Sequence, residues 1–530
     1  MREHRASDCG RQTSNVRRRT SGARRRLLQS FVLLLVCALF TFCSKKPPAD
    51  TLVMIIESSP TNLDPRVGVD AFSERIDTLI FDDLLTRSDN LGVAPGLAES
   101  WDVPDPLTYV FHLHHGVKFH DGRPLTSRDV KWTFDSLLQH IIRSTKTGPY
   151  RFVDHIDAPD DYTVVFHMKE PDASLLWNVS DGAMGIVPQG ARDEMSQHPI
   201  GSGPFKFVSA ETDREVIVER NNDYWGKKPK LPRVRFAVVP DGTTEALELR
   251  KGSCDLSINS YITPDMIVTL SRDPDLVVES SPGTRLAYLG FNLRDPILKD
   301  ARVRQAIAYA LDRKPMIEYL WRGEARPARS VLPPQSWAYD GDVPAYDHDP
   351  AKAMQLLDAA GYPAVNGVRF HITMKTSTDE NTRLMFAVMQ QQLREVGIAL
   401  DIRSFEFATF FSDVTHGAFQ LYGLRWIGGN EDPDIFEHVF HSSQFPPNGA
   451  NRGYYLNSEV DSLIDQARRE VDPRLRKPLY DQVQRILARD LPYINLWYLD
   501  NVLVHTRRVR NIQLNSAGNY DFLRTAELAP

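Results

Sequence analysis

Residues 370–402 constrain the possible folds more than any other part of the chain. Apolar residues alternate with polar ones at the start of this segment, recur at helical spacing in its middle and alternate again at its end. A strand, a helix and a second strand in this order form a parallel pair in one sheet. A buried strand is also predicted at 52–56, and a second strand–helix–strand unit at 234–258. An α/β fold is therefore expected.

The cysteine content shows how the fold is held together. Only Cys254 lies beyond residue 43, so neither an internal disulfide framework nor a cysteine-rich metal site is possible there. The chain must rely on buried apolar surface, and its length suits two or three domains.

Residues 1–43 have the pattern of an export signal. This segment contains nine arginines and only two acidic residues, Glu3 and Asp8. Its apolar run at 27–42 is too short to span a membrane comfortably. Cys43, followed by serine, two lysines and two prolines, resembles the lipidation site of bacterial lipoproteins, although Phe42 replaces the usual small residue. An ordinary cleaved signal and an uncleaved anchor are the alternatives. The protein is expected in the periplasm or cell envelope, lipid-anchored through Cys43.

The charge balance excludes one class of partner. Without residues 1–43, the chain has 54 basic and 67 acidic residues, a formal charge of −13. An acidic surface repels phosphate backbones, so nucleic-acid binding is not expected.

The segment 425–434 combines residue types that suit a ligand-binding loop. Trp426 offers apolar area and one N–H donor, and the glycines at 428 and 429 allow a close approach of the backbone. Glu431 and Asp432 are positioned to accept hydrogen bonds from an ammonium or amide group. This composition predicts a polar ligand with a positive charge at one end. A surface turn closed by the Asp-Pro pair is the alternative.

Short motifs follow one another in a characteristic order over nearly all of the chain after residue 50. They include NLDP at 62–65, PGLAESW at 95–101, GVKFHDGRPLT at 116–126, GSGPFK at 201–206, VRQAIAYALD at 303–312, and Trp426 with the Asp-Pro pair at 432–433. Each motif alone is weakly specific. The ordered set resembles the family 5 extracellular solute-binding proteins, the peptide, dipeptide and nickel class of ABC-importer receptors.

The resemblance implies a two-lobe periplasmic-binding-protein fold of type II, with mixed sheets, a hinge and an extra inserted domain. Lobe I would contain a core domain formed by 44–81, 200–280 and 498–530, with the inserted domain at 82–199; lobe II would span 281–497. A monomer of this kind encloses its ligand between the lobes and delivers it to an ABC permease and ATPase complex.

The resemblance also implies a set of ligand contacts. In peptide-binding relatives, an aspartate three residues after the loop tryptophan anchors the α-ammonium of the ligand, and here that position is Gly429. Either Glu431 or Asp432 replaces it through a loop shift, or Asp432 holds the Asp-Pro turn. The predicted ligand-binding residues are Asp70, Ala71, Ser73, Tyr288, Tyr422, Arg425, Trp426, Ile427, Gly428, Gly429, Asn430 and Glu431.

A peptide is the first choice of ligand. The alternatives are a sugar, a metal chelate or an amide-containing metabolite, or an envelope enzyme or sensory protein on the same scaffold. The sequence contains no Gly-x-Ser-x-Gly, His-Glu-x-x-His, phosphate-loop or Gly-x-Gly-x-x-Gly motif, so no enzyme activity and no cofactor are expected. Histidines crowd residues 112–120, but His120-Asp121-Gly122 is typical of a turn, and no metal site is predicted.

Overall fold

The computed structural model describes residues 47–530 except 89, 181, 183, 429 and 530. Cys43 and the predicted export signal lie outside the described residues. Residues 47–530 form one compact unit. Among the described residues, none of the helices combines the length and apolar character needed to cross a membrane.

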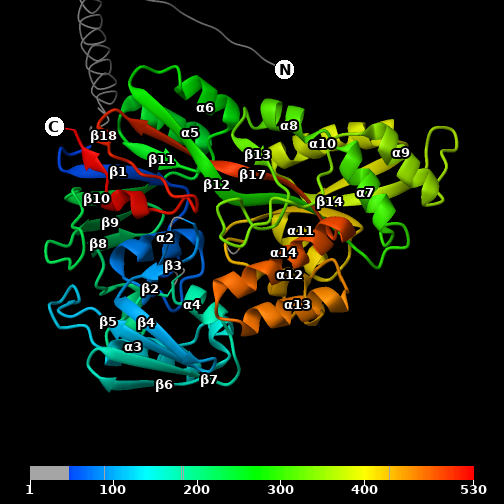
Figure 1. Ribbon diagram of the computed structural model, residues 1–530. Helices are drawn as coiled ribbons and strands as arrows, with labels where there is room; N and C mark the ends of the chain where they lie inside the picture. Colours follow the sequence, from blue (N-terminus) through cyan, green and yellow to red (C-terminus); the bar gives the residue numbers. More distant parts are fainter. Residues whose placement is uncertain (1–46, 89, 181, 183, 429, 530) are drawn as a thin grey trace, which may run out of the picture. The chain divides into compact units, whose positions relative to one another are not determined.

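An eleven-stranded mixed sheet forms the framework of this unit (Figure 1). Ten of its strands follow the order β15 (Ile398–Phe405), β14 (Phe370–Ser377), β16 (Leu421–Trp426), β12 (Leu276–Phe291), β17 (Tyr493–Thr506), β11 (Leu256–Ile258), β1 (Thr51–Ile56), β10 (Arg233–Val238), β9 (Glu215–Arg220) and β8 (Phe205–Glu211), and β13 (Ala325–Pro327) pairs with β17. We call β8 to β11 with β1 the β1 side, and β14 to β16 the β14 side.

Both predicted parallel units are present. Strands β14 and β15 pair in parallel and are joined by α10 (Glu380–Glu395), as residues 370–402 predicted. Strands β10 and β11 are joined by α5 (Gly242–Lys251), and each pairs in parallel with β1, which lies between them. The two strands of the second unit are therefore not direct neighbours, because β1, which comes earlier in the chain, lies between them.

The long strands β12 and β17 connect the two sides of the sheet (Figure 1). They pair antiparallel, and their register is interrupted between Ser281 and Arg285. At this interruption the backbones come unusually close: a Cβ added to Gly283 would lie 2.2 Å from the carbonyl oxygen of Leu499. Only glycine permits this approach.

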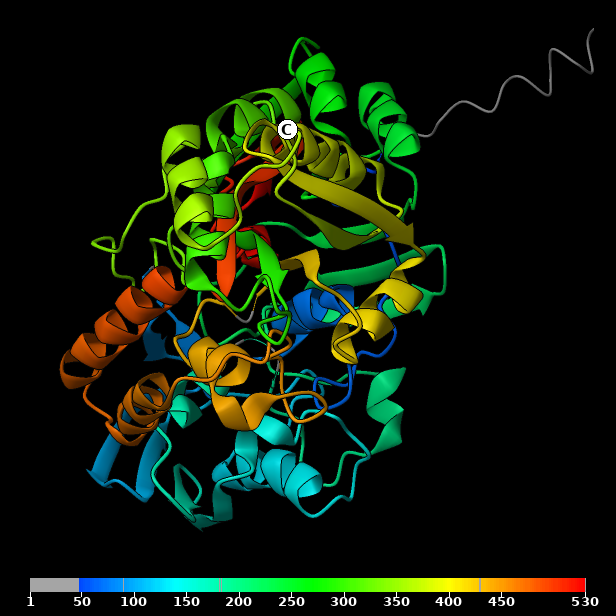
Figure 2. The same ribbon diagram turned by 90° about the vertical axis from the view of Figure 1, so that its right-hand side faces the viewer.

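The β14 side is covered by helices on both faces (Figure 2). Successive residues of a strand point to opposite faces of a sheet. Accordingly, Ala287 and Leu289 of β12 belong to the core under α7 (Ala301–Ala310) and α10, whereas Leu286 and Tyr288 belong to the core under α12 (Ile435–Phe440) and α14 (Pro473–Asp490). The apolar run of β12 follows from burial on both faces.

A separate four-stranded antiparallel sheet lies within the segment 82–199 (Figure 1). Its order is β4 (Ala98–Asp105), β5 (Thr108–Leu113), β7 (Thr163–Met168) and β6 (Val153–Asp160). In β5 the residues Tyr109, Phe111 and Leu113 are buried and alternate with less buried ones. This face packs against α3 (Ser127–Leu138), whose Phe134 contacts the ring of Phe166 edge-on.

The remaining elements complete these layers. They are α2 (Ala71–Ile80), α4 (Ser174–Asn178), α6 (Pro264–Leu270), α8 (Arg313–Leu320), α9 (Pro350–Ala359), α11 (Phe407–Thr415), α13 (Ser458–Arg469), the short strands β2 (Leu85–Arg87), β3 (Val93–Pro95), β18 (Val509–Arg510) and β19 (Glu527–Leu528), and the 3-10 helices η1 (Gly148–Tyr150), η2 (Asp193–Ser196), η3 (Ser442–Gln444) and η4 (Asp521–Arg524). Asp300 caps α7 and Asp349 caps α9, because each side chain accepts a hydrogen bond from a backbone N–H group of the first turn.

Candidate functional site

A cavity of about 670 Å³ lies where several distant parts of the chain meet. It is lined by residues of the segments 78–91 and 513–525, by Ser180 and Gly182, by Ser281 and Pro282 of β12, and by Gln335. Its volume is in the range of ordinary small-ligand sites. Since the irregular part of β12 contributes to the wall, the cavity adjoins the region where the two sides of the sheet are joined.

The strand ends near this region follow a general rule for α/β sheets. Ligands of such sheets bind outside the carboxyl ends of the parallel strands. Glu57 and Asn259 directly follow β1 and β11, while Arg425 lies at the end of β16 and Asp379 shortly follows β14. Polar residues from both sides of the sheet therefore lie at carboxyl edges.

The loop 425–434 begins at the end of β16 and ends at α12, and its Glu431 is bound by the protein itself. Glu431 is only 1 % exposed; its Oε2 lies 2.5 Å from Nη1 of Arg87, and its Oε1 accepts a hydrogen bond of 2.8 Å from Oγ1 of Thr284. Arg87 lies on β2, lines the large cavity and has its guanidinium carbon 4.0 Å from the centre of the Trp177 ring. Glu431 thus links β2 and β12.

Asp432 is also turned into the protein. Burial raises its pKa to about 6, although the positive charge of Arg476 acts in the opposite direction. Its Oδ1 accepts a 2.8 Å hydrogen bond from the backbone N–H of Asp434, which is the turn predicted for the Asp-Pro pair. Both carboxylates are therefore buried among protein partners in this structure, and their contact with a positive charge of the ligand stays a prediction.

The other loop residues differ in accessibility. Asn430 is fully buried and donates through Nδ2 to the carbonyl oxygens of Thr284 and Val331 at 2.8 and 3.1 Å. Gly428 has a φ of +84°, and Ile427 is 61 % exposed. Gly429, the position of the missing anchor, lies outside the described residues.

Trp426 is half-buried in an aromatic group. Its ring is nearly parallel to that of Tyr288 at 6.1 Å, and the guanidinium of Arg452 lies 5.5 Å from its centre. Tyr288 stacks on Tyr493 at 4.3 Å, and the hydroxyl groups of Tyr422 and Tyr493 are 3.2 Å apart. Tyr288 and Tyr422 are almost fully buried, so in this structure they support Trp426 from the core and present no surface to a ligand.

Asp70, Ala71 and Ser73 lie at the start of α2. Oδ1 of Asp70 accepts hydrogen bonds from the backbone N–H groups of Phe72 and Ser73, and its Oδ2 accepts from the hydroxyl groups of Ser73 and Thr61. Burial favours the neutral carboxyl, yet hydrogen bonds from Ser73 and Thr61 prevail and lower the pKa of Asp70. Asp70 and the buried Ser73 serve as the helix cap, and Ala71 is exposed.

Arg425 lies near two arginines that the sequence did not single out. Arg425 of β16 pairs with Ala287 of β12, and Arg285 lies two residues before Ala287 on the same face, which makes the two arginines diagonal neighbours. Arg75 lies on α2. Burial and the positive charges of Arg425 and Arg75 lower the pKa of Arg285 to about 10. No local motif could have grouped these arginines, since only the fold brings them together.

The predicted histidine cluster splits into separate structural roles. His120 contacts the carbonyl oxygen of Gly203 through Nε2 at 3.1 Å, and burial lowers its pKa to about 4. His112 lies 3.0 Å from a carboxylate oxygen of Asp102.

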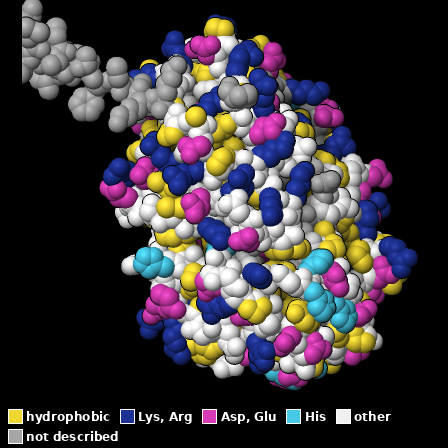
Figure 3. Space-filling view, turned by 90° about the vertical axis from the view of Figure 1, so that its left-hand side faces the viewer, with side chains coloured by type: hydrophobic (Ala, Val, Ile, Leu, Met, Phe, Trp, Pro, Cys, Tyr) yellow, Lys and Arg dark blue, Asp and Glu magenta, His cyan; other side chains and the backbone are white. Residues whose placement is uncertain are grey.

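A different histidine group, missed because it spans two strands, comprises His155, Asp157 and His167 on β6 and β7. Their potential ligand atoms lie within 4.8 Å of one another. The two imidazole rings are stacked, with planes that differ by only 13°, so their lone pairs lie in separate, nearly parallel planes and do not converge on one metal position. Figure 3 shows histidine side chains gathered beside acidic ones on one face of the molecule.

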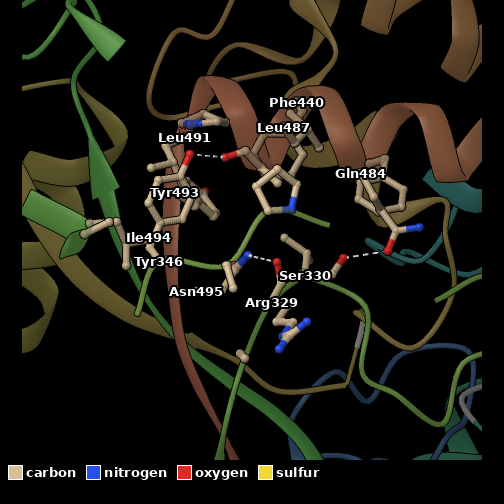
Figure 4. A pocket seen from close by; sticks show the side chains of 18 of the residues that line it. Arg329, Ser330, Tyr346, Phe440, Gln484, Leu487, Leu491, Tyr493, Ile494 and Asn495 are labelled. Atoms are coloured by element: carbon tan, nitrogen blue, oxygen red, sulfur yellow. Dashed lines mark hydrogen bonds between the residues drawn. The ribbon is translucent and has the colours of Figure 1, made fainter. Parts of the chain in front are cut away.

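A second cavity, of about 40 Å³, lies between β17, α14 and the segment 328–346 (Figure 4). Ser330 donates to Oε1 of Gln484 at 2.8 Å across its wall, beside Tyr493 and Asn495. This volume suits a water molecule or two and is far too small for a peptide.

Comparison with known proteins gave consistent matches. Residues 92–446 match the family model described as "Bacterial extracellular solute-binding proteins, family 5 Middle". Di/tripeptide-binding protein 4 of Pseudomonas aeruginosa is 31 % identical over 528 residues, covering 93 % of this chain and 98 % of the relative. Di/tripeptide-binding protein 1 of the same organism is 29 % identical, covering 88 % and 93 %. Among solved structures, the periplasmic binding protein DppA from Helicobacter pylori in complex with the peptide STSA has a TM-score of 0.74 and 27 % identity, covering 90 % of this chain and 98 % of the other.

Proposed function

The chain belongs to the bacterial extracellular solute-binding proteins of family 5, and on this premise we propose that it binds a peptide reversibly and delivers it to an ABC permease and ATPase complex. The observation that carries the proposal is the cavity of about 670 Å³ whose wall combines β12, the segment 78–91 and the C-terminal segment. Relatives named as di/tripeptide-binding proteins, and a structural relative in complex with a peptide, support a peptide as the ligand.

The proposed binding movement is a rotation about β12 and β17. These strands join the two sides of the sheet, and their register is interrupted beside the cavity. The lobes would be the segments expected from the sequence, with 44–81, 200–280 and 498–530 in the core of lobe I, 82–199 inserted into it, and 281–497 as lobe II. A few residues at such an interruption can absorb the change in backbone angles during lobe closure.

Contacts across the proposed lobes support a closed arrangement. Arg87 pairs with Glu431, and Nη2 of Arg468 on α13 lies 3.4 Å from Oδ1 of Asp172. The backbone N–H of Trp337 donates to the carbonyl oxygen of Asn90 at 3.1 Å. These contacts connect the segment 82–199 with the segment 281–497.

The proposal includes the place and the outcome of binding. The protein acts outside the cytoplasm, with Cys43 carrying a lipid that holds it at a membrane. It releases its ligand chemically unchanged, since it acts as a receptor and not as an enzyme. Trp426 and the exposed Ile427 are its proposed apolar contacts, and Gly428 and Gly429 allow the ligand to approach the backbone.

Calorimetric titration of the mature protein with di-, tri- and tetra-alanine tests the proposal. We expect one bound peptide per chain, a change in tryptophan fluorescence, and an unaltered ligand mass after release. Trp426→Ala should weaken binding more than about tenfold, because large aromatic anchors dominate such sites. Tyr319→Ala is the control, since Tyr319 is 64 % exposed on α8. Hydrolysis of the peptides, or the absence of binding to a broad peptide library, would contradict the proposal.

A further inference from the structure

We propose that Arg75, Arg285 and Arg425 form an arginine subsite that binds an anionic group of the ligand, a carboxylate in the case of a peptide. This inference rests on the proposed receptor function and specifies the chemistry that the receptor selects. It reverses the expectation drawn from the carboxylates of the loop 425–434.

Two of the three arginines lie on elements that contribute to the wall of the large cavity, α2 and β12, but none of the three lines it. Arg75 lies one helical turn before Thr78, which lines the cavity, so the two residues share a face of α2. Arg285 follows the lining residue Pro282 by three positions, across the register interruption of β12, so strand alternation does not place the two side chains on one face. Arg425 is the diagonal neighbour of Arg285 and has a side chain that is 39 % exposed. One arginine thus comes from each of three separate segments.

The hydrogen bonds of Arg285 leave its charge poorly matched. Its Nη2 donates to two uncharged acceptors, Oδ1 of Asn259 at 2.9 Å and the carbonyl oxygen of Asp500 at 2.8 Å. Its Nε is buried and has no acceptor within the described part of the chain. A guanidinium in this state has donors that match the planar geometry of a carboxylate.

Three acidic groups lie around the subsite, and two of them, Asp379 and Asp500, have other partners. Asp379 is 4.0 Å from Arg425, but its Oδ1 also accepts the backbone N–H of Thr382 as the cap of α10. The carboxylate of Asp500 pairs with Nε of Arg326 at 2.8 Å. Glu57 lies close enough for the positive charges of Arg75 and Arg285 to act on it, while burial raises its pKa.

The charge of the three arginines is opposite to the net charge of the whole protein. The chain after residue 43 has a formal charge of −13, which disfavours anionic solutes in general. A local group of arginines is what an anion-binding site on such a protein requires. The nearby carboxylates Glu431 and Asp432 do not cancel it, because they are buried among partners of their own.

Calorimetry with three tripeptides tests the subsite directly. The probes are Ala-Ala-Glu, Ala-Ala-Gln and Ala-Ala-Gln with an amidated C-terminus, which carry two, one and no carboxylates. We expect affinity to fall at least about tenfold from the first to the last, because each carboxylate that is lost removes a charge-assisted contact with the arginines. The difference should shrink at high salt.

Variants locate the effect. Arg425→Gln should reduce the preference for Ala-Ala-Glu about tenfold, and Arg425→Lys, which keeps the charge, should retain most of it. The control is Arg469→Gln, an exposed arginine on α13, which should behave like the unchanged protein. Equal affinity for all three probes, or an undiminished preference in Arg425→Gln, would overturn the subsite while leaving the receptor function intact.

A second measurement keeps the inference testable if no peptide binds. In that case the proposed peptide receptor fails, and the subsite is examined by thermal unfolding with N-acetylglutamate and N-acetylglutamine as probes. The subsite predicts that only the glutamate derivative raises the unfolding temperature, and only while Arg425 is present. The same shift with both probes, no shift with either, or a shift retained in Arg425→Gln would overturn it.

Discussion

Two regions where distant segments meet have opposite charge patterns. The first, which we call the paired-charge interface, comprises Arg87, Asp172, Glu431, Asp434 and Arg468. There, Nε of Arg468 lies 2.7 Å from Oδ1 of Asp434, and its Nη2 lies 3.4 Å from Oδ1 of Asp172. Arg87 pairs with Glu431. The second is the arginine subsite, where like charges are neighbours. Buried charges of opposite sign hold parts of a chain together, whereas neighbouring like charges repel one another and attract an ion of opposite sign.

The largest expected effect in this comparison comes from Arg468→Ala. Arg468 is almost fully buried, and its removal would leave Asp172 and Asp434 without their common partner. We expect the free energy of unfolding to fall by about 3–5 kcal/mol. Chemical denaturation monitored by tryptophan fluorescence measures this change. Arg469→Ala, at the neighbouring exposed position, should change it by less than about 0.5 kcal/mol, and equal effects of the two variants would contradict the pairing.

Arg87 and Glu431 should respond unequally to mutation. Arg87→Ala leaves a carboxylate that is 1 % exposed without its cation, and we expect a loss of about 2–4 kcal/mol in the free energy of unfolding. Glu431→Gln leaves an arginine that is 23 % exposed and stacked on Trp177, with an expected loss of about 1 kcal/mol.

Denaturation of the double variant Arg87→Ala with Glu431→Gln provides the control for that asymmetry. Part of the loss caused by Arg87→Ala should be recovered, because the unpaired charge is gone. Additive losses would show that the two side chains do not interact.

Asp432, which lies between Glu431 and Asp434 in sequence but is not itself part of the paired-charge interface, should make the stability of the protein sensitive to pH. Burial raises its pKa from 3.8 to about 6, so the folded protein holds this proton more tightly than the unfolded chain does. Its stabilising contribution is complete below the unfolded pKa and is lost as the pH rises through about 6. Asp432→Asn, which keeps an oxygen acceptor for Asp434, should therefore gain about 2–3 kcal/mol relative to the unchanged protein between pH 4 and pH 7. Denaturation at several pH values would show a constant difference if Asp432 titrates normally.

The smallest change in the free energy of unfolding is expected at the arginine subsite, and it is a gain, whereas Arg468→Ala is expected to cause a loss. Arg425→Gln removes one of the positive charges that act on Arg285, and without ligand it should raise the free energy of unfolding by about 0.5 kcal/mol or less. This gain should disappear at high salt. Arg425→Lys should show no gain, because it retains the charge. A loss of stability in Arg425→Gln would mean that the three arginines do not repel one another.

Local patterns predicted much of the fold correctly. The strand–helix–strand unit at 370–402 and the caps at Asp300 and Asp349 were predictable, because periodicity and capping depend on residues close in sequence. The position of β1 between β10 and β11 was not predictable, since the order of strands in a sheet depends on how distant parts of the chain assemble.

The sequence by itself determined the residue types of the candidate site: a tryptophan loop with glycines and carboxylates, in a chain whose ordered motifs identify its family. Only the tertiary structure decided which charges that site offers. Glu431 pairs with Arg87, a residue 344 positions away, and is therefore not presented to a ligand in this structure. Arg425 lies beside Arg285 because β16 pairs with β12. The physical reason is that a side chain's charge acts through its surroundings, and those are fixed by contacts between residues far apart in the chain.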